Sequence, residues 1–233
     1  MKHEPALVSL VHLGCARNLI DSELILGRMA EEGLVITDDA SSAHTVVLNT
    51  CSFIGPAREE SEGAIRDLLA RKKRGEIQRV VVAGCLVQRY KQDLAAQFPA
   101  VDLFAEISDY KTLAKSLRAL TLGKGTPKYL EGPLERAPER EGARLVSTPK
   151  SYAYLRISHG CDHLCSFCAI PSIRGKHRSK PLEAVVAEAQ ELVAGGTKEL
   201  VLVAEDSTAW GRDMERELPD LVEALAGVKG VKR

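Results

Sequence analysis

The sequence predicts an α/β protein built on a parallel sheet. Short runs of β-branched and aliphatic residues alternate with longer segments whose apolar residues have helical spacing, which is the pattern of βαβ units. The 233 residues suffice for one large domain or two ordinary ones. Apolar residues make up 45% and charged residues 27% of the chain, so we expect a folded globular protein rather than a disordered one.

The first half alternates strands with helices. Runs of valine, leucine, isoleucine and alanine predict strands at residues 6–11, 45–48, 79–83 and 101–104. Helical spacing of apolar residues predicts a helix after each strand, at residues 18–31, 60–71, 88–96 and 110–120. The second of these helices ends in the basic run 71–74, which suits a helix C-terminus.

The second half begins with a change of composition. Glycines, prolines and charges break every periodicity from residue 122 to 150, which predicts a connection between domains with room for short strands. The rest predicts strands at 153–157 and 199–204, helices at 181–194 and 214–225, and the start of a third strand at 230–232. The expected domains are therefore 1–121 and 151–233, joined by 122–150. Because two parallel strands are unstable alone, the second segment should join the first sheet or belong to a longer protein.

Charge and hydropathy exclude some classes of protein. Lys and Arg number 32, as do Asp and Glu, which argues against binding nucleic acid or anionic membranes by bulk charge. No apolar run approaches the ~20 residues that span a bilayer, and no signal-peptide core follows the N-terminus. We therefore expect a cytoplasmic protein, in which six reduced cysteines suggest metal binding or catalysis rather than disulfides.

One group of cysteines is local. Cys161, Cys165 and Cys168 have C-x3-C-x2-C spacing directly after a predicted strand. Three thiolates on one short loop can hold three irons of a 4Fe–4S cluster and leave the fourth iron open to a small molecule. The alternative is zinc, with His159, His163 or His177 as the fourth ligand.

The other cysteines are dispersed. Cys15, Cys51 and Cys85 each lie just past a predicted strand. Because the carboxyl ends of parallel strands share one edge of a sheet, these three side chains could converge on a second cluster with an open iron. The alternative is that each is a small buried apolar residue.

Both groups occur in motifs of a known family. The local group resembles the radical S-adenosylmethionine (SAM) signature, with Phe167 as its aromatic residue, and residues 160–163 and 170–175 extend the likeness to the methylthiotransferase branch. Three further segments are similar to the N-terminal motifs of that branch: residues 14–18 together with 21–23, residues 49–51, and residues 84–85. The resemblance implies a flavodoxin-like N-terminal domain followed by the first part of a (βα)6 partial TIM barrel. The family's C-terminal β-barrel has no counterpart, so we expect a truncated chain that is inactive alone.

The resemblance also implies cofactors and their ligands. Cys161, Cys165 and Cys168 would bind a 4Fe–4S cluster whose open iron takes SAM, with Phe167 beside the adenine. Cys15, Cys51 and Cys85 would bind a second 4Fe–4S cluster that carries the sulfur to be transferred.

Two interpretations are open for the polar residues near these motifs. The sequence assigns no residue as catalytic. Glu205 and Asp206 would accept the SAM amino group; the alternative is a solvated turn in which Asp206 or Ser207 caps a helix. The basic residues of 174–180 would bind the SAM carboxylate or an acidic substrate, or form a solvated loop.

The family modifies either an adenosine in tRNA or the β-carbon of an aspartate in small-subunit ribosomal protein twelve. Residues 18–23, 49–54 and 202–208 resemble the protein-modifying branch, although Glu205 replaces its usual glutamine. We therefore expect a ribosomal-protein substrate, a flavodoxin-type electron donor and no membrane partner. The alternatives are the tRNA enzyme, which would bind nucleic acid, and a non-catalytic Fe–S or zinc module.

Overall fold

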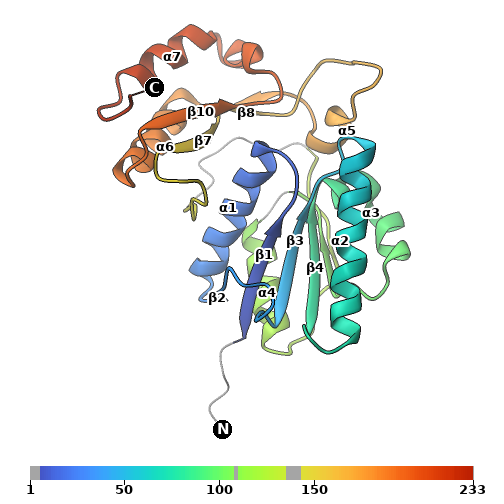
Figure 1. Cartoon of the computed structure of the whole chain (residues 1–233). Coiled ribbons are helices and arrows are strands. Elements are labelled where there is room, and N and C mark those ends of the chain that lie inside the picture. The colour runs from blue at the N-terminus through green and yellow to red at the C-terminus, as the bar shows by residue number, and fades with distance from the viewer. Residues whose placement is uncertain (1–5, 108–109, 135–142, 233) are drawn as a thin grey trace. The chain divides into compact units, whose positions relative to one another are not determined.

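The structure is a computed structural model that describes residues 6–107, 110–134 and 143–232 (Figure 1). The chain divides into two compact units, one of residues 1–133 with 143–145 and one of the remaining residues to 233. Within the described ranges, no helix combines the length and the apolar character needed to cross a membrane.

The first unit is built on a six-stranded sheet in the order β2-β1-β3-β4-β5-β6. Every neighbouring pair is parallel. The strands are β1 (Leu7–His12), β2 (Val35–Ile36), β3 (Thr45–Thr50), β4 (Arg79–Gly84), β5 (Leu103–Ala105) and β6 (Tyr129–Leu130). The first five follow the flavodoxin-like order, whose switch point lies between β1 and β3. The predicted α/β class and parallel sheet are thereby confirmed.

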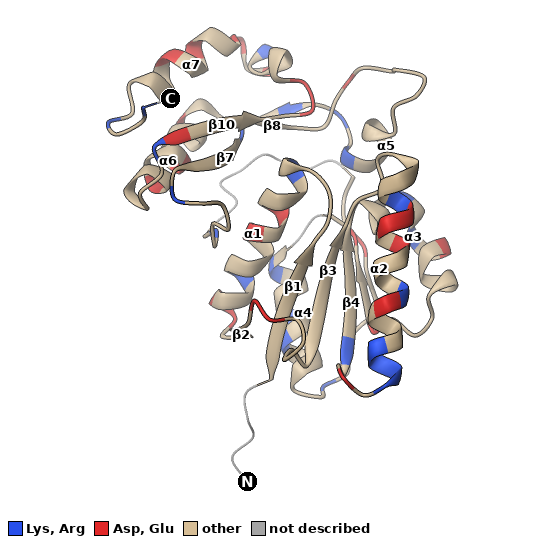
Figure 2. Ribbon diagram, in the orientation of Figure 1, with Lys and Arg blue, Asp and Glu red and all other residues tan. Residues whose placement is uncertain are grey.

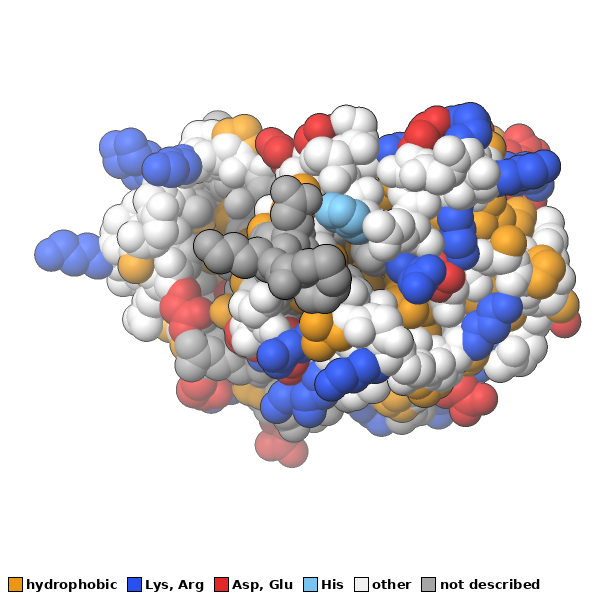
Figure 3. Space-filling model, turned by 90° about the horizontal axis from the view of Figure 1, so that it is seen from below, with side chains coloured by type: hydrophobic (Ala, Val, Ile, Leu, Met, Phe, Trp, Pro, Cys, Tyr) orange, Lys and Arg blue, Asp and Glu red, His pale blue; other side chains and the backbone are white. Residues whose placement is uncertain are grey.

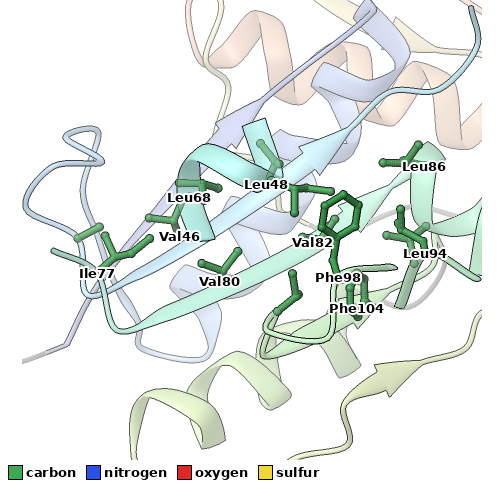
Figure 4. Packing of buried hydrophobic residues seen from close by; sticks show 14 residues of the cluster. Val46, Leu48, Leu68, Ile77, Val80, Val82, Leu86, Leu94, Phe98 and Phe104 are labelled. Carbon is green, nitrogen blue, oxygen red and sulfur yellow. The ribbon is translucent and has the colours of Figure 1, made fainter. Parts of the chain in front are cut away.

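In the part of the first unit that the structure describes, four helices cover this sheet: α1 (Ala16–Glu31), α2 (Gly55–Lys73), α3 (Cys85–Gln97) and α4 (Tyr110–Thr121). Helices α1 and α4 pack together, while α2 and α3 contact β3 and β4. Val46, Leu48, Val80 and Val82 face α2 and α3 in one apolar cluster (Figure 4). All six residues of β3 are buried, which explains why its centre, residues 46–48, is continuously apolar instead of alternating.

Some boundaries of the first unit differ from the expected ones. Helix α2 begins at Gly55 instead of residue 60, because Pro56 suits the first helical turn. Its basic residues 71–73 lie in its last turn, as expected (Figure 2). Helix α3 begins at Cys85 rather than 88, and Lys91 interrupts it with φ 46°. The connection contributes β6 to the edge of the sheet.

Within its described residues, the second unit has two small sheets. Strands β7 (Tyr152–Arg156) and β10 (Glu199–Val203) are parallel, and β8 (Ser158–His159) pairs antiparallel with β9 (Arg178–Ser179). The helices are α5 (Ile170–Arg174), α6 (Leu182–Ala194), the 3₁₀ turns η1 (Ser207–Ala209) and η2 (Arg212–Met214), and α7 (Leu218–Ala226). The second unit has its own apolar cluster, which includes Leu155, Val185, Trp210 and Leu221. Thus β7 and β10 do not join the first sheet.

The end of the second unit corrects two expectations. Helix α7 begins at Leu218 instead of residue 214, because Pro219 occupies its first turn and Glu217 forms a capping box with Asp220. No strand forms over 230–232 in the described part of the chain. Instead, the Lys232 N–H donates to the Lys198 carbonyl at 2.8 Å.

Candidate functional site

The dispersed cysteines lie at the carboxyl ends of three adjacent strands. Cys15 follows β1 and is the N-cap of α1. Cys51 directly follows β3, and Cys85 follows β4 as the first residue of α3. All are free thiols; Cys15 is exposed and the other two are buried. The structure therefore brings Cys15, Cys51 and Cys85 to one edge of the sheet, beside the switch point between β1 and β3.

Two glycines let these strand ends approach closely. Gly14 has φ +99°, and a Cβ there would lie 2.6 Å from the Cβ of Cys51. Gly84 has φ +97°, and a Cβ there would lie 2.7 Å from the Thr50 carbonyl oxygen. Only glycine adopts such backbone angles without strain. A glycine therefore precedes Cys15 and Cys85 because the chain passes close to the end of β3 at both places.

Hydroxyl groups fix the backbone around the buried cysteines. The Ser61 hydroxyl accepts a hydrogen bond from the Cys51 N–H at 3.1 Å and donates to the Cys51 carbonyl at 2.8 Å. The Ser52 hydroxyl donates to the Cys85 carbonyl at 3.1 Å. The sequence alone predicts no role for either serine, because each contact joins residues ten or more positions apart.

The environment of Cys15 favours its thiolate. Burial raises the pKa of this thiol, but the Asn18 backbone N–H and the Arg17 side chain lower it more, so the net pKa lies below its ordinary value. The thiolate is the form that ligates metal, so these contacts match a ligand role.

The local cysteines lie on a loop between β8 and α5. Pairing of β8 with β9 closes the base of the loop, and the Cys161 N–H donates to the Gly175 carbonyl at 3.1 Å. Gly160 has φ +77°, and a Cβ there would lie 2.1 Å from the Lys176 carbonyl oxygen. Cys165 is exposed, whereas Cys161 and Cys168 are half-buried. One loop with a tightly closed base thus carries all three thiols.

A pocket of about 280 Å³ adjoins this loop. Its lining comprises Cys161, Asp162, His163, His177, Arg178, Asp206, Ala209, Arg212 and Asp213. Carboxylates and guanidinium groups are the partners that the amino and carboxylate groups of an amino acid require, so the lining fits a ligand such as SAM.

The predicted SAM-binding residues lie in different surroundings. One Asp206 oxygen accepts from the Thr208 N–H at 3.0 Å and the other contacts His163 Nε2 at 2.9 Å. The Thr208 hydroxyl is the largest of the causes that lower the pKa of Asp206. Asp206 is thus the N-cap of η1, as in the alternative interpretation. Glu205 is half-buried after β10, and Phe167 is 85% exposed on the loop.

The histidines considered for zinc have other contacts. His177 Nε2 lies 3.1 Å from the Ser179 hydroxyl, and His159 is buried in β8. Among the described residues, no group of three or more His, Cys, Asp or Glu side chains is arranged to hold one metal ion. In a 4Fe–4S cluster each thiolate binds a different iron, and three thiols at each site fit a cluster with one open iron.

Comparisons with known proteins agree with this picture. Residues 8–106 match the Uncharacterized protein family UPF0004, and residues 155–231 match the Radical SAM superfamily. The ribosomal protein uS12 methylthiotransferase RimO of Trichlorobacter lovleyi is 45% identical over 97% of this chain and 50% of its own length. The corresponding protein of Geobacter sulfurreducens is 42% identical over 99% of this chain and 52% of its own length. The chain belongs to the radical-SAM methylthiotransferase family and spans about half the length of these relatives.

Solved structures support the fold alone. The radical S-adenosylmethionine methyltransferase TsrM of Kitasatospora setae matches 94% of this chain and 52% of its own, with a TM-score of 0.60 and 17% identity. The cobalamin-dependent S-adenosylmethionine radical enzyme OxsB matches 97% of this chain and 38% of its own, with a TM-score of 0.58 and 12% identity.

Proposed function

We propose that this chain forms the cluster-binding part of an enzyme that adds a methylthio group to the β-carbon of an aspartate in ribosomal protein uS12. The observation that carries the proposal is the presence of two sets of three cysteines, one in each unit. Relatives that are 42–45% identical over nearly the whole chain bear the name of this activity, which supports the choice of substrate.

The proposal assigns a separate task to each set. Cys161, Cys165 and Cys168 hold the cluster that takes SAM, with Phe167 beside the adenine and Glu205 or Asp206 at the amino group. Cys15, Cys51 and Cys85 hold the cluster that carries sulfur. When bound, reduced cluster and SAM together supply a carbon radical strong enough to abstract hydrogen from an unactivated carbon. The chain's own task is to leave one iron open at each site, which three thiolates rather than four achieve.

Three further elements belong to the same proposal. The electron donor is a flavodoxin-type reductant, and the protein works in the cytoplasm, where its six cysteines remain reduced. The functional division is a sulfur-cluster domain of residues 1–121, a connection over 122–150 and a barrel portion over 151–233.

The test is a chimera, because the chain spans half of its relatives. The chain is fused to the C-terminal half of the Geobacter sulfurreducens relative and expressed in a host that lacks both methylthiotransferase activities. Mass spectrometry should find a methylthio group on an aspartate of uS12, and no mark when Cys161, Cys165 and Cys168 are replaced by alanine. A mark on a tRNA adenosine alone would transfer the protein to the nucleic-acid-modifying branch.

A further inference from the structure

Two buried asparagines lie among the three cysteine-bearing strand ends, and the proposed function gives them no task. Asn18 and Asn49 are 0% and 1% exposed. Asn18 follows Cys15 by three positions and Asn49 precedes Cys51 by two. Both are therefore placed by the same segments that carry the thiols.

The Asn18 amide joins the ends of β1 and β3. Its Nδ2 donates to the Leu13 carbonyl at 2.6 Å and to the Thr50 carbonyl at 3.2 Å. Thr50 directly precedes Cys51 in the sequence. Strand ends have carbonyl groups that the sheet no longer pairs, and a side-chain NH₂ supplies two donors from one point.

The Asn49 amide reaches from α1 to the end of β4. Its Nδ2 donates to the Asn18 carbonyl at 3.0 Å and to the Ser22 hydroxyl at 2.8 Å. Its Oδ1 faces the other way, since a Cβ on Gly84 would lie 2.3 Å from it. Gly84 directly precedes Cys85, so the two amides together lie beside the backbone within two positions of each of the three cysteines.

Stability alone does not account for this pair. The Oδ1 atoms of Asn18 and Asn49 have no hydrogen-bond partner among the described residues. A buried polar atom without a partner costs free energy, and an apolar residue of the same shape avoids that cost. The pair keeps two such atoms, which points to a task beyond filling the core.

We propose that Asn18 and Asn49 are positioning residues that set the spacing of the Cys15, Cys51 and Cys85 thiols, an inference that rests on the proposed cluster site. The Asn18 donors join the end of β1 to the end of β3, and the Asn49 donors hold the start of α1 against β3. The close approach at Gly84 then lets β4 deliver its cysteine to the same place. Loss of either amide leaves the thiols present but wrongly spaced.

The test uses isosteric variants in the whole chain. Asn18→Asp and Asn49→Asp keep the side-chain shape but replace the NH₂ donor by an acceptor oxygen. Cys161, Cys165 and Cys168 are replaced by serine so that iron reports only on the first site. The control is Met29→Ala, which removes a fully buried side chain near the other end of α1.

After anaerobic loading with ferrous iron and sulfide, both asparagine variants should hold iron about tenfold more weakly against a chelator, as expected when residues that orient metal ligands are lost. The electron paramagnetic resonance spectrum of their remaining reduced cluster should also change. Met29→Ala should unfold at a lower denaturant concentration but keep the iron and the spectrum of the parent. Parent-like iron and spectra in both asparagine variants would overturn the proposal.

A metal-free measurement separates this inference from the proposed function. Dibromobimane becomes fluorescent when it bridges two neighbouring thiols, so it reports thiol spacing without iron. The parent and Met29→Ala should be bridged, and the asparagine variants several-fold less. A parent that binds no iron but shows this difference would refute the cluster and leave the positioning role standing. Equal bridging in all chains, or none in the parent, would refute the positioning role. If an aspartate variant does not fold, the smaller serine replaces the asparagine at the same position, as Asn18→Ser or Asn49→Ser.

Discussion

At the scale of single residues, Gly84 determines how closely β3 and β4 approach at their carboxyl ends. Its backbone has φ 97° and ψ −159°, a region open only to glycine. A side chain would collide with Asn49 Oδ1 at 2.3 Å and with the Thr50 carbonyl oxygen at 2.7 Å. Backbone strain and steric collision therefore act at the same position.

We predict that Gly84→Ala lowers the free energy of unfolding by at least about 1–3 kcal/mol, the usual cost of such a strained backbone. Gly63 is a matched control, because it lies inside α2 with nothing within 4 Å of its missing Cβ. Gly63→Ala should raise the free energy of unfolding by about 0.5–1 kcal/mol, since glycine weakens a helix. Urea unfolding of the three proteins gives the comparison, and shifts of the same sign would contradict the argument.

At this scale the sequence predicts candidate ligands but not the contacts that hold them in place. A cysteine just past a predicted strand can be placed on the sheet edge from topology alone, as for Cys15, Cys51 and Cys85. The bond of Ser61 to Cys51 and that of Asn18 to Thr50 join different elements. No local pattern encodes such pairs, so their roles could be read only from the structure.

At the scale of elements, long periodic segments are predictable and short ones are not. Helices α1 and α4 have apolar faces that repeat over several turns, and both form within two residues of the expected boundaries. Strands β2 and β6 have two residues each, too few for any periodicity. The start of α7 depends on Pro219 and the capping box of Glu217, which outweigh the apolar pattern that begins at Met214.

Residues 143–145 form an irregular segment that contacts helix α1. The Leu145 N–H donates to the Glu23 carbonyl at 3.1 Å, and Arg144 pairs with the Glu23 carboxylate. The side chains of Arg144 and Glu23 are only 5% and 1% exposed. Gly27 permits the approach, because a Cβ there would lie 2.0 Å from the Ala143 carbonyl oxygen. The segment thus packs on α1 through partners more than a hundred positions away.

We predict that Glu23→Gln costs about 3–5 kcal/mol of unfolding free energy, because it removes the buried carboxylate that pairs with the Arg144 guanidinium. The control on the same helix is Glu31→Gln, which breaks the more exposed pair with Arg28 and should cost no more than about 1 kcal/mol. The double variant Glu23→Leu with Arg144→Met should recover most of the loss, since it removes both charges. Equal costs for Glu23→Gln and Glu31→Gln in chemical denaturation would show that burial does not matter here.

At the scale of the whole molecule, charge is balanced and apolar packing is divided. Acidic and basic side chains are interspersed on the face drawn in Figure 3, in keeping with the net charge of zero. Each unit has its own apolar cluster, one around Val46 and Val82 and one around Leu155 and Trp210. Each unit also has its own set of three cysteines. Metal binding at one set should therefore not require the other.

The two sets nevertheless differ in what they need from the fold. Cys161, Cys165 and Cys168 lie within eight residues of one loop, so the loop alone brings them together. Cys15, Cys51 and Cys85 come together only when β1, β3 and β4 are paired. The set in the loop is thus local in sequence, whereas the set at the strand ends depends on the folded sheet.

We predict that the chain loaded anaerobically with iron and sulfide holds two 4Fe–4S clusters, or about eight irons. Replacing either set of three cysteines by alanine should remove about half of the iron, because three ligands of one cluster are lost each time. In moderate urea, iron held by Cys15, Cys51 and Cys85 should be released together with unfolding of the sheet, as followed by circular dichroism. Iron analysis and visible absorbance check the counts. Stoichiometric zinc without iron-dependent absorbance would refute both clusters, whereas iron that disappears completely on replacing one set would show that the two sites assemble as one.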